Sequence, residues 1–320
     1  MLACPAFLPY FRHPCPRDYV DTLGSGARPA NGAGTRLLLY FPIYFMQNPR
    51  GTLIALGGGD DDGLISLIRS ELCTVNSNIE VITTATLEPM ESGQAYKEAF
   101  EELGCSSVRF MHIDEDNEAD KPENLERIAQ AEVIFFTGGN QLRLKEFLAG
   151  SKLHRLMQTR YLEEEITIAG TSAGAAAMSD RMIYEGYGYY SLMKGEVKTT
   201  DGLSFIQNVF IDTHFTERGR FGRLAHAVSK RPQFVGIGLG EETGIIIKGG
   251  QHVEVFGTGV VTIMDSSHVR YSNLEEVDEG EPIAVENLIM HLLVEGHEYC
   301  LTDRVFRKLS QQKRRTASKA

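Results

Sequence analysis

Short apolar segments alternate with longer amphipathic segments from Gly51 onward, a pattern that predicts strands followed by helices. The expected strands cover 52–56, 79–84, 107–112, 133–136 and 166–169. The expected helices cover 64–72, 91–103, 122–131 and 142–148. Strands that alternate with helices favour a mostly parallel, doubly wound α/β sheet of the flavodoxin-like, class I glutamine amidotransferase-like kind.

The pattern changes beyond residue 185. Residues 185–194 carry too many Gly and Tyr for a regular element, and we expect a loop there. Strands are expected at 209–212, 233–239, 244–248, 253–256 and 260–264, with one helix at 218–230. Gly257 and Gly259 separate the last two of these strands, which favours antiparallel hairpins toward the C-terminus.

Both ends of the chain lack this periodicity. Residues 1–45 are rich in Pro, Gly and Ala and are expected to form a disordered leader, with Met46 as a candidate natural start. Residues 46–309 are expected to form a single α/β domain. Residues 310–320 are basic and polar, as in a flexible tail.

Composition and charge narrow the class of protein. The 320 residues carry a net charge of −11, which disfavours a general nucleic-acid binder. No apolar run approaches the roughly 20 residues that a membrane helix needs. The five cysteines are scattered without a CxxC pair, which favours reduced thiols and a cytoplasmic protein over a disulfide framework or a zinc site.

The segment ITIAGTSAGAAAMS holds the most specific candidate for chemistry. Gly170 and Gly174 bracket Ser172 between an apolar strand and a run of helix-forming alanines. Strand, tight turn and helix with Ser at the apex is the context of a nucleophile elbow. The structural alternative is a helix N-cap serine between two packing glycines.

A serine nucleophile needs a base and an orienting acid elsewhere in the chain. His214 ends an apolar strand two residues after Asp212, and residues two apart share one face of a strand. Asp212 could therefore orient His214 or hold a substrate, whereas the alternative is a solvated strand-end histidine. Glu241 and Glu242 follow another strand on opposite faces, so only one of them can serve as the acid.

Three further groups suggest how a substrate could bind. Arg218, Arg220 and Arg223 near a helix start fit a carboxylate-binding site, although a solvated basic face has the same spacing. Backbone N–H groups of Gly139, Asn140 and Ala173 could form an oxyanion hole beside Ser172. The glycine-rich GGGDDDG segment lacks the residues of a phosphate-binding loop, and its aspartates would repel phosphate.

Five motifs together resemble the cyanophycinases, serine peptidases of family S51: GGGDDDG, FFTGGNQLRL, IAGTSAGAAAMS, DTHFTERGRFGRL and GIGLGEETGI. The resemblance runs from about Met46 nearly to the C-terminus. It implies a homodimer that cleaves cyanophycin, a poly-aspartate with arginine on each β-carboxyl, to β-Asp-Arg dipeptides without metal or cofactor. The roles that it implies are Ser172 as nucleophile, His214 as base, Glu241 as acid, and Gln141, Asp212, Arg218, Arg220 and Arg223 in the substrate pocket.

One residue departs from the family pattern. Cyanophycinases usually carry Gln beside the catalytic His, where this chain has the shorter Thr213. We therefore expect Thr213 to alter the pocket, and the polymer need not be the true substrate. Two alternatives remain: an aspartyl dipeptidase of the same superfamily, and a non-catalytic binding protein on the same fold.

Overall fold

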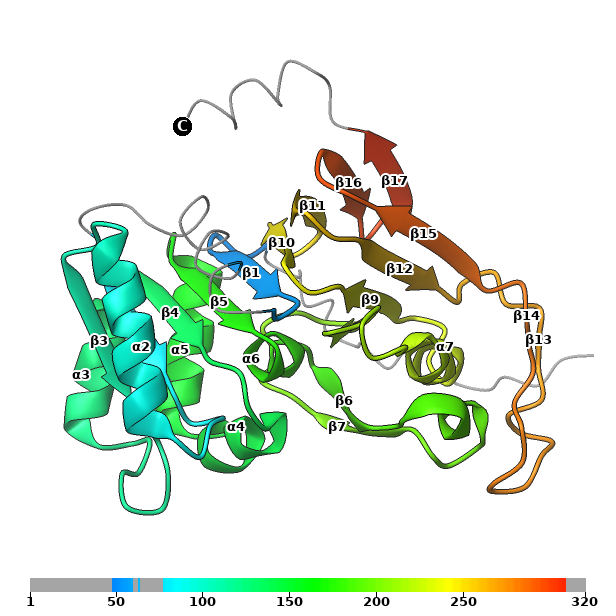
Figure 1. Cartoon of the computed structure of the whole chain (residues 1–320), viewed down its shortest axis with the longest axis horizontal. Coiled ribbons are helices and arrows are strands. Elements are labelled where there is room, and N and C mark those ends of the chain that lie inside the picture. The colour runs from blue at the N-terminus through cyan, green and yellow to red at the C-terminus, as the bar shows by residue number, and fades with distance from the viewer. Residues whose placement is uncertain (1–47, 60–62, 64–76, 309–320) are drawn as a thin grey trace, which may run out of the picture. The chain divides into compact units, whose positions relative to one another are not determined.

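A computed structural model of the chain describes residues 48–59, 63 and 77–308 (Figure 1). The expectations for the leader at 1–45, the helix at 64–72 and the tail at 310–320 lie outside the described residues.

A nine-stranded sheet forms the centre of the fold, in the order β17-β16-β11-β10-β1-β5-β4-β2-β3 (Figure 1). Its parallel half is β1 (Thr52–Leu56), β5 (Thr167–Thr171), β4 (Val133–Phe136), β2 (Asn78–Ile82) and β3 (Ser107–Met111). The antiparallel half is β10 (Thr243–Lys248), β11 (His252–Gly257), β16 (His297–Cys300) and β17 (Val305–Lys308). The expected parallel α/β core is confirmed.

Helices cover both faces of the parallel half. They are α2 (Pro89–Glu102), α3 (Pro122–Gln130), α4 (Gln141–Leu148), α5 (Lys152–Glu163) and α6 (Ala173–Ala177). Successive β1 residues enter different clusters: Leu53 packs with buried residues of α3 to α6, and Ile54 packs with Phe100 of α2. Because the strand is buried on both faces, it reads as a continuous apolar run.

A second sheet has the order β15-β12-β9-β8. Its strands are β8 (Val209–Asp212), β9 (Val235–Leu239), β12 (Val261–Asp265) and β15 (Ile289–Leu293). The expectation of a hairpin around Gly257 and Gly259 was wrong in its pairing. β11 pairs with β10 in the central sheet, whereas β12 pairs with β9 and β15 in the second.

The remaining elements are short. They are β6 (Arg181–Glu185), the 3₁₀ turn η1 (Gly188–Leu192), β7 (Lys198–Asp201), α7 (Phe221–Ser229), β13 (Tyr271–Ser272) and β14 (Val285–Glu286). β6 pairs with β7, and β13 pairs with β14. Within the described ranges, no helix is both long and apolar enough to cross a bilayer.

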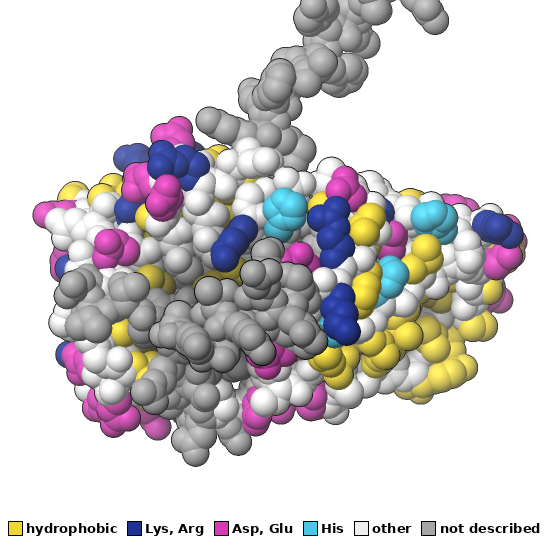
Figure 2. Space-filling view, turned by 90° about the horizontal axis from the view of Figure 1, so that it is seen from above, with side chains coloured by type: hydrophobic (Ala, Val, Ile, Leu, Met, Phe, Trp, Pro, Cys, Tyr) yellow, Lys and Arg dark blue, Asp and Glu magenta, His cyan; other side chains and the backbone are white. Residues whose placement is uncertain are grey.

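The edge strands β15 and β17 carry several apolar side chains at the surface. Met290, Leu292 and Phe306 are exposed, and the rings of His291 and His297 lie beside Phe306. Figure 2 looks from above onto the side of the molecule where β15 to β17 lie uppermost in Figure 1, and it shows hydrophobic side chains gathered near histidines.

Candidate active site

Ser172 occupies a sharp turn between β5 and α6. Its backbone has φ 50° and ψ −112°, a conformation that costs energy for a residue with a side chain. The flanking glycines allow the chain to pack tightly around it. A Cβ on Gly174 would lie 2.3 Å from the Phe136 carbonyl oxygen, and one on Gly170 would lie 2.9 Å from the Gly174 backbone. This strand–turn–helix geometry is that of a nucleophile elbow.

Three side chains from distant parts of the sequence form a continuous hydrogen-bonded line. The Ser172 Oγ lies 2.8 Å from His214 Nε2. On the other side of the ring, His214 Nδ1 lies 2.6 Å from Glu241 Oε1. A hydroxyl, an imidazole and a carboxylate in this order are the groups that a serine nucleophile needs.

The segment after β1 fixes the backbone of all three motifs. The Ser172 amide donates to the Leu56 carbonyl at 3.1 Å, and the His214 amide donates to the Gly57 carbonyl at 2.8 Å. The Glu242 amide donates to the Gly58 carbonyl, also at 2.8 Å. Leu56, Gly57 and Gly58 therefore connect the elbow after β5, which neighbours β1, with the segments after β8 and β9 of the second sheet.

Gly58 lies against the candidate site at a position that the sequence did not single out. Its φ is +91°, and a Cβ there would lie 2.4 Å from Cε1 and 2.7 Å from Nε2 of His214. The imidazole thus packs directly against the backbone of Gly58. Only glycine leaves room for the ring in this position.

Of the two acidic candidates, Glu241 reaches the ring and Glu242 lies elsewhere. The Glu242 side chain packs toward Gly63, where a Cβ would lie 2.7 Å from its Cγ. His214 and Glu242 both have positive φ, 46° and 52°. Both therefore leave the regular strand geometry, which separates Glu241 from Glu242 and turns the His214 ring toward Ser172.

The residues expected to form an oxyanion hole divide into two groups. Among the described residues, the backbone N–H groups of Gly139 and Ala173 have no hydrogen-bond acceptor, and Gly138 lies beside the Ser172 side chain. The Asn140 amide instead donates to the Ala85 carbonyl at 2.9 Å, and its side chain caps α4 by accepting from the Leu142 amide. Its amide is already engaged, so Asn140 was a wrong choice of donor.

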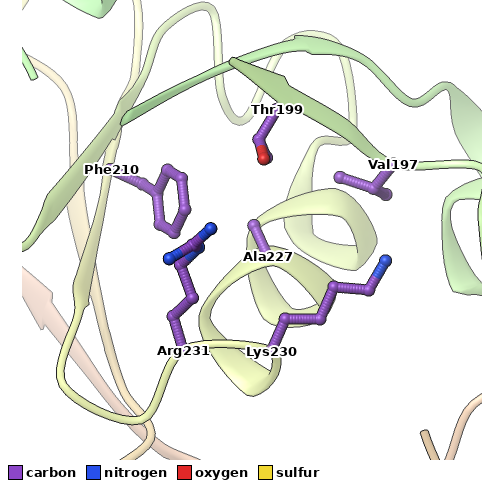
Figure 3. Close-up of a pocket in the computed structure, with 6 residues that line it drawn as sticks. All are labelled: Val197, Thr199, Phe210, Ala227, Lys230 and Arg231. Atoms are coloured by element: carbon purple, nitrogen blue, oxygen red, sulfur yellow. The ribbon is translucent and has the colours of Figure 1, made fainter. Parts of the chain in front are cut away.

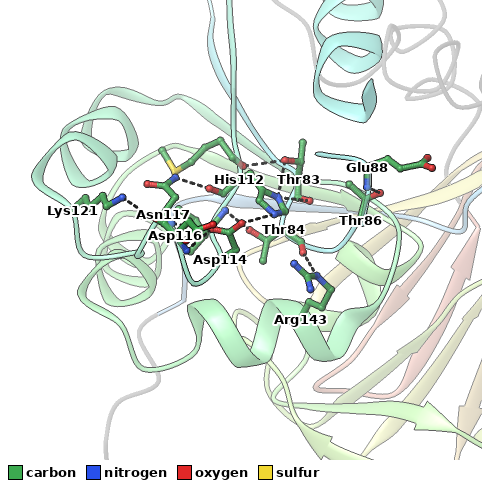
Figure 4. Close-up of polar contacts among 12 residues, drawn as sticks. Thr83, Thr84, Thr86, Glu88, His112, Asp114, Asp116, Asn117, Lys121 and Arg143 are labelled. Carbon is green, nitrogen blue, oxygen red and sulfur yellow. Dashed lines mark hydrogen bonds and ion pairs between the residues drawn. The ribbon is translucent and has the colours of Figure 1, made fainter. Parts of the chain in front are cut away.

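A polar network at the ends of β2 and β3 supports the loop that carries Gly139 (Figure 4). Arg143 Nε donates to the Thr84 carbonyl at 2.9 Å, and a Cβ on Gly139 would lie 2.2 Å from the Ala85 carbonyl oxygen. His112 Nδ1 lies 3.1 Å from the Thr83 carbonyl oxygen. The loop carrying Gly139 therefore rests against a backbone segment that side chains hold in place.

Asp212 does not orient His214, so that interpretation was wrong. Its carboxylate is buried and bidentate to Arg223, with Arg223 Nε donating to Oδ2 at 2.6 Å. Arg220 Nη1 adds a bond of 3.3 Å to Oδ1. Both carboxylate oxygens are thus engaged by guanidinium groups, and Asp212 and Arg223 form a buried ion pair beneath the site.

The other candidates for a substrate pocket are Arg220, Thr213, Arg218 and Gln141, and they differ in burial and in hydrogen-bond partners. Arg220 Nη1 donates to the Thr213 carbonyl at 2.6 Å, and burial lowers the pKa of Arg220 although Asp212 opposes the shift. Thr213 is buried, whereas Arg218 is exposed and without a side-chain partner in the described part of the chain. Gln141 Nε2 donates to the Ile183 carbonyl at 3.0 Å.

A cavity of about 260 Å³ lies elsewhere, near the end of α7 (Figure 3). It is lined by Val197, Thr199, Phe210, Ala227, Lys230 and Arg231. None of these belongs to the Ser172–His214–Glu241 line. Two other histidines are buried and bonded to backbone carbonyls: His154 to Leu203 and His226 to Ser191.

Comparison with known proteins decides the family. The model of peptidase family S51 matches residues 53–255, which span all three members of the hydrogen-bonded line. The chain belongs to peptidase family S51. It is 34% identical to the cyanophycinase of Geminocystis herdmanii over 79% of this chain and 94% of that protein. It is 32% identical to the cyanophycinase of Synechococcus elongatus over 79% of this chain and 80% of that protein.

Among solved structures, the chain is similar to a peptidase from an acI-B1 actinobacterium. The TM-score is 0.57 at 21% identity, and the match covers 81% of this chain and 100% of that peptidase. That likeness supports the fold. Family membership and the curated relatives make this chain a cyanophycinase-like hydrolytic peptidase of family S51.

Proposed function

We propose that the chain cleaves the aspartyl backbone of cyanophycin to β-Asp-Arg dipeptides by serine catalysis. The observation that carries the proposal is the line from Ser172 Oγ through His214 to Glu241, at 2.8 Å and 2.6 Å. Family membership and the cyanophycinase relatives supply the substrate class.

The reaction follows from the order of the three groups. His214 Nε2 takes the Ser172 proton as Oγ attacks the aspartyl carbonyl carbon, and the Glu241 carboxylate stabilises the imidazolium that forms. The backbone N–H groups of Gly139 and Ala173 receive the oxyanion. His214 then gives its proton to the leaving amine, and water attacks the acyl-enzyme with His214 again as base.

Substrate recognition is assigned to the arginines near the start of α7. Arg218 is exposed and Arg220 is partly buried, so their guanidiniums are available to bind the carboxylates of the substrate side groups. Asp212 forms ion pairs with Arg223 and with Arg220, and it thereby fixes the position of the Arg220 guanidinium. Thr213 and Gln141 complete the wall of this proposed site, and Thr213 is where it differs from the family pattern.

The test is turnover of purified protein with cyanophycin, β-Asp-Arg and α-Asp dipeptides, with Ser172→Ala as the control. Release of β-Asp-Arg from polymer by the wild type alone is the expected result. Cleavage restricted to α-Asp dipeptides would favour an aspartyl dipeptidase. Binding of polymer without turnover, and without labelling of Ser172 by a serine-reactive probe, would favour a binding protein.

A further inference from the structure

Three tyrosines are exposed together on the turn between β6 and β7. The exposed fractions of Tyr187, Tyr189 and Tyr190 are 67%, 69% and 68%. The rings of Tyr189 and Tyr190 meet edge to face, with centroids 6.1 Å apart. Large aromatic side chains gathered at a surface mark an interaction site more often than chance exposure does.

This turn packs against the start of α7. His226 Nδ1 lies 3.0 Å from the Ser191 carbonyl oxygen, and a Cβ on Gly222 would lie 2.5 Å from Ser191 Oγ. Arg220 is the N-cap residue of the same helix, α7. The aromatic turn is therefore continuous with the proposed carboxylate-binding arginines.

Acidic residues border the turn on its other side. The Lys194 amide donates to the Glu281 carbonyl at 2.8 Å, and the Ile283 amide donates to the Leu192 carbonyl at 2.8 Å. The same segment carries Glu279 and Glu281, which are exposed residues. The Glu279 carboxylate lies against Gly195 of the turn, and Glu281 Oε2 accepts from the Asp278 amide at 2.9 Å. Figure 1 shows this arrangement, with the turn between β6 and β7 lying below α7 and toward the β13–β14 ribbon.

We propose that the tyrosine surface, defined as Tyr187, Tyr189 and Tyr190 with Glu279 and Glu281, is a subsite for the guanidinium groups of an extended polypeptide substrate. The proposal rests on the proposed function, because it places substrate repeats outside the cleavage site. The surface places acidic glutamates beside the tyrosines and basic arginines near the start of α7. A substrate repeat that carries both a guanidinium and a carboxylate complements these two groups of charges. Its guanidinium stacks on the tyrosine rings beside the glutamates, and its carboxylates face Arg218 and Arg220.

The size of the effect follows from the exposure of the rings. An exposed contact between a guanidinium and an aromatic ring contributes a factor of about 2 to 5 in affinity. Loss of two such contacts therefore raises KM about 4- to 25-fold for a substrate long enough to reach the subsite. For a substrate that fills only the cleavage site, loss of these contacts leaves KM unchanged.

The experiment compares long polymer with the shortest peptide that the wild type cleaves. For the double variant Tyr189→Ala/Tyr190→Ala, we expect a raised KM for polymer, an unchanged kcat and unchanged kinetics on the short peptide. Tyr189→Phe/Tyr190→Phe keeps the rings and is expected to behave as wild type. Tyr271→Ala, at a tyrosine 46% exposed on β13, is the matched surface control.

Three results would overturn the subsite. The first is an equal loss on polymer and short peptide, and the second is an unchanged KM for polymer in the alanine double variant. The third is a change of sedimentation mass in that variant, which would make the surface a contact between copies of the chain. In these cases the wild type still cleaves its substrates, whereas a wild type that cleaves neither substrate would overturn the proposed function itself.

Discussion

Gly58→Ala is the substitution in which the structure predicts the largest effect from the smallest chemical change. The added Cβ would lie 2.4 Å from His214 Cε1, whereas ordinary contacts begin at 3.4 Å, so the ring must move by about 1 Å. The ring is held by bonds of 2.8 Å and 2.6 Å on its two sides. A displacement of this size breaks at least one of them.

The expected cost is mainly catalytic. A misplacement of about 1 Å costs about 100-fold in rate, and loss of the orienting acid costs up to about 10,000-fold. We expect kcat to fall about 100- to 1,000-fold on the polymer substrate. The positive φ of +91° adds about 1–2 kcal/mol of destabilisation for any residue with a Cβ.

Gly104→Ala separates the two effects. Its φ is +90°, and a Cβ there would meet nothing within 4 Å, so it carries the backbone cost without the contact to a ring. Initial rates and urea unfolding of both variants make the comparison. We expect similar losses of unfolding free energy and a fall in kcat for Gly58→Ala alone. A Gly58→Ala protein with wild-type kcat would refute the packing argument.

Three further predictions concern the acid, the buried ion pair and pH. Glu241→Gln should lower kcat about 1,000- to 10,000-fold in initial-rate assays, because an amide cannot stabilise the imidazolium; an unchanged kcat would mean that another group is the acid. Asp212→Asn leaves the buried Arg223 guanidinium without its counter-charge, so urea titration should show a loss of about 3–5 kcal/mol, and a loss under 1 kcal/mol would contradict it. Burial lowers the pKa of His154 and His226 below 6.5. Below pH 6.5 the unfolded chain therefore binds more protons at these two histidines than the folded chain does. Stability should be complete above pH 6.5 and fall as pH drops below it, and a His154→Gln/His226→Gln variant that keeps the full dependence would exclude this cause.

The parallel core could be predicted from the sequence because its strands are buried on both faces and its helices have regular apolar spacing. The helix α5 follows the same rule with Leu153, Met157 and Tyr161 four residues apart, and attention to that spacing would have found it. The pairing of β11 and β12 could not be predicted, because Gly257 and Gly259 indicate a turn without indicating which sheet each strand joins.

The candidate site shows where local rules end. Asp212 and His214 would share a face on a regular strand, but β8 ends at Asp212 and His214 has φ 46°, so the period of two no longer applies. The Asn140 amide bonds to Ala85, 55 residues away in sequence, and no local pattern reveals that contact. Gly58 belonged to a recognised motif, yet its contact with the His214 imidazole, from the segment after β8, depends on tertiary packing alone.

The most direct test of the central claim is covalent labelling with a fluorophosphonate probe, followed by peptide mass spectrometry. If His214 and Glu241 activate Ser172, the wild type should carry one adduct on the peptide containing Ser172, and Ser172→Ala should lose both the adduct and turnover. An unlabelled wild type that still cleaves its substrate, or a Ser172→Ala protein that retains turnover, would contradict the account.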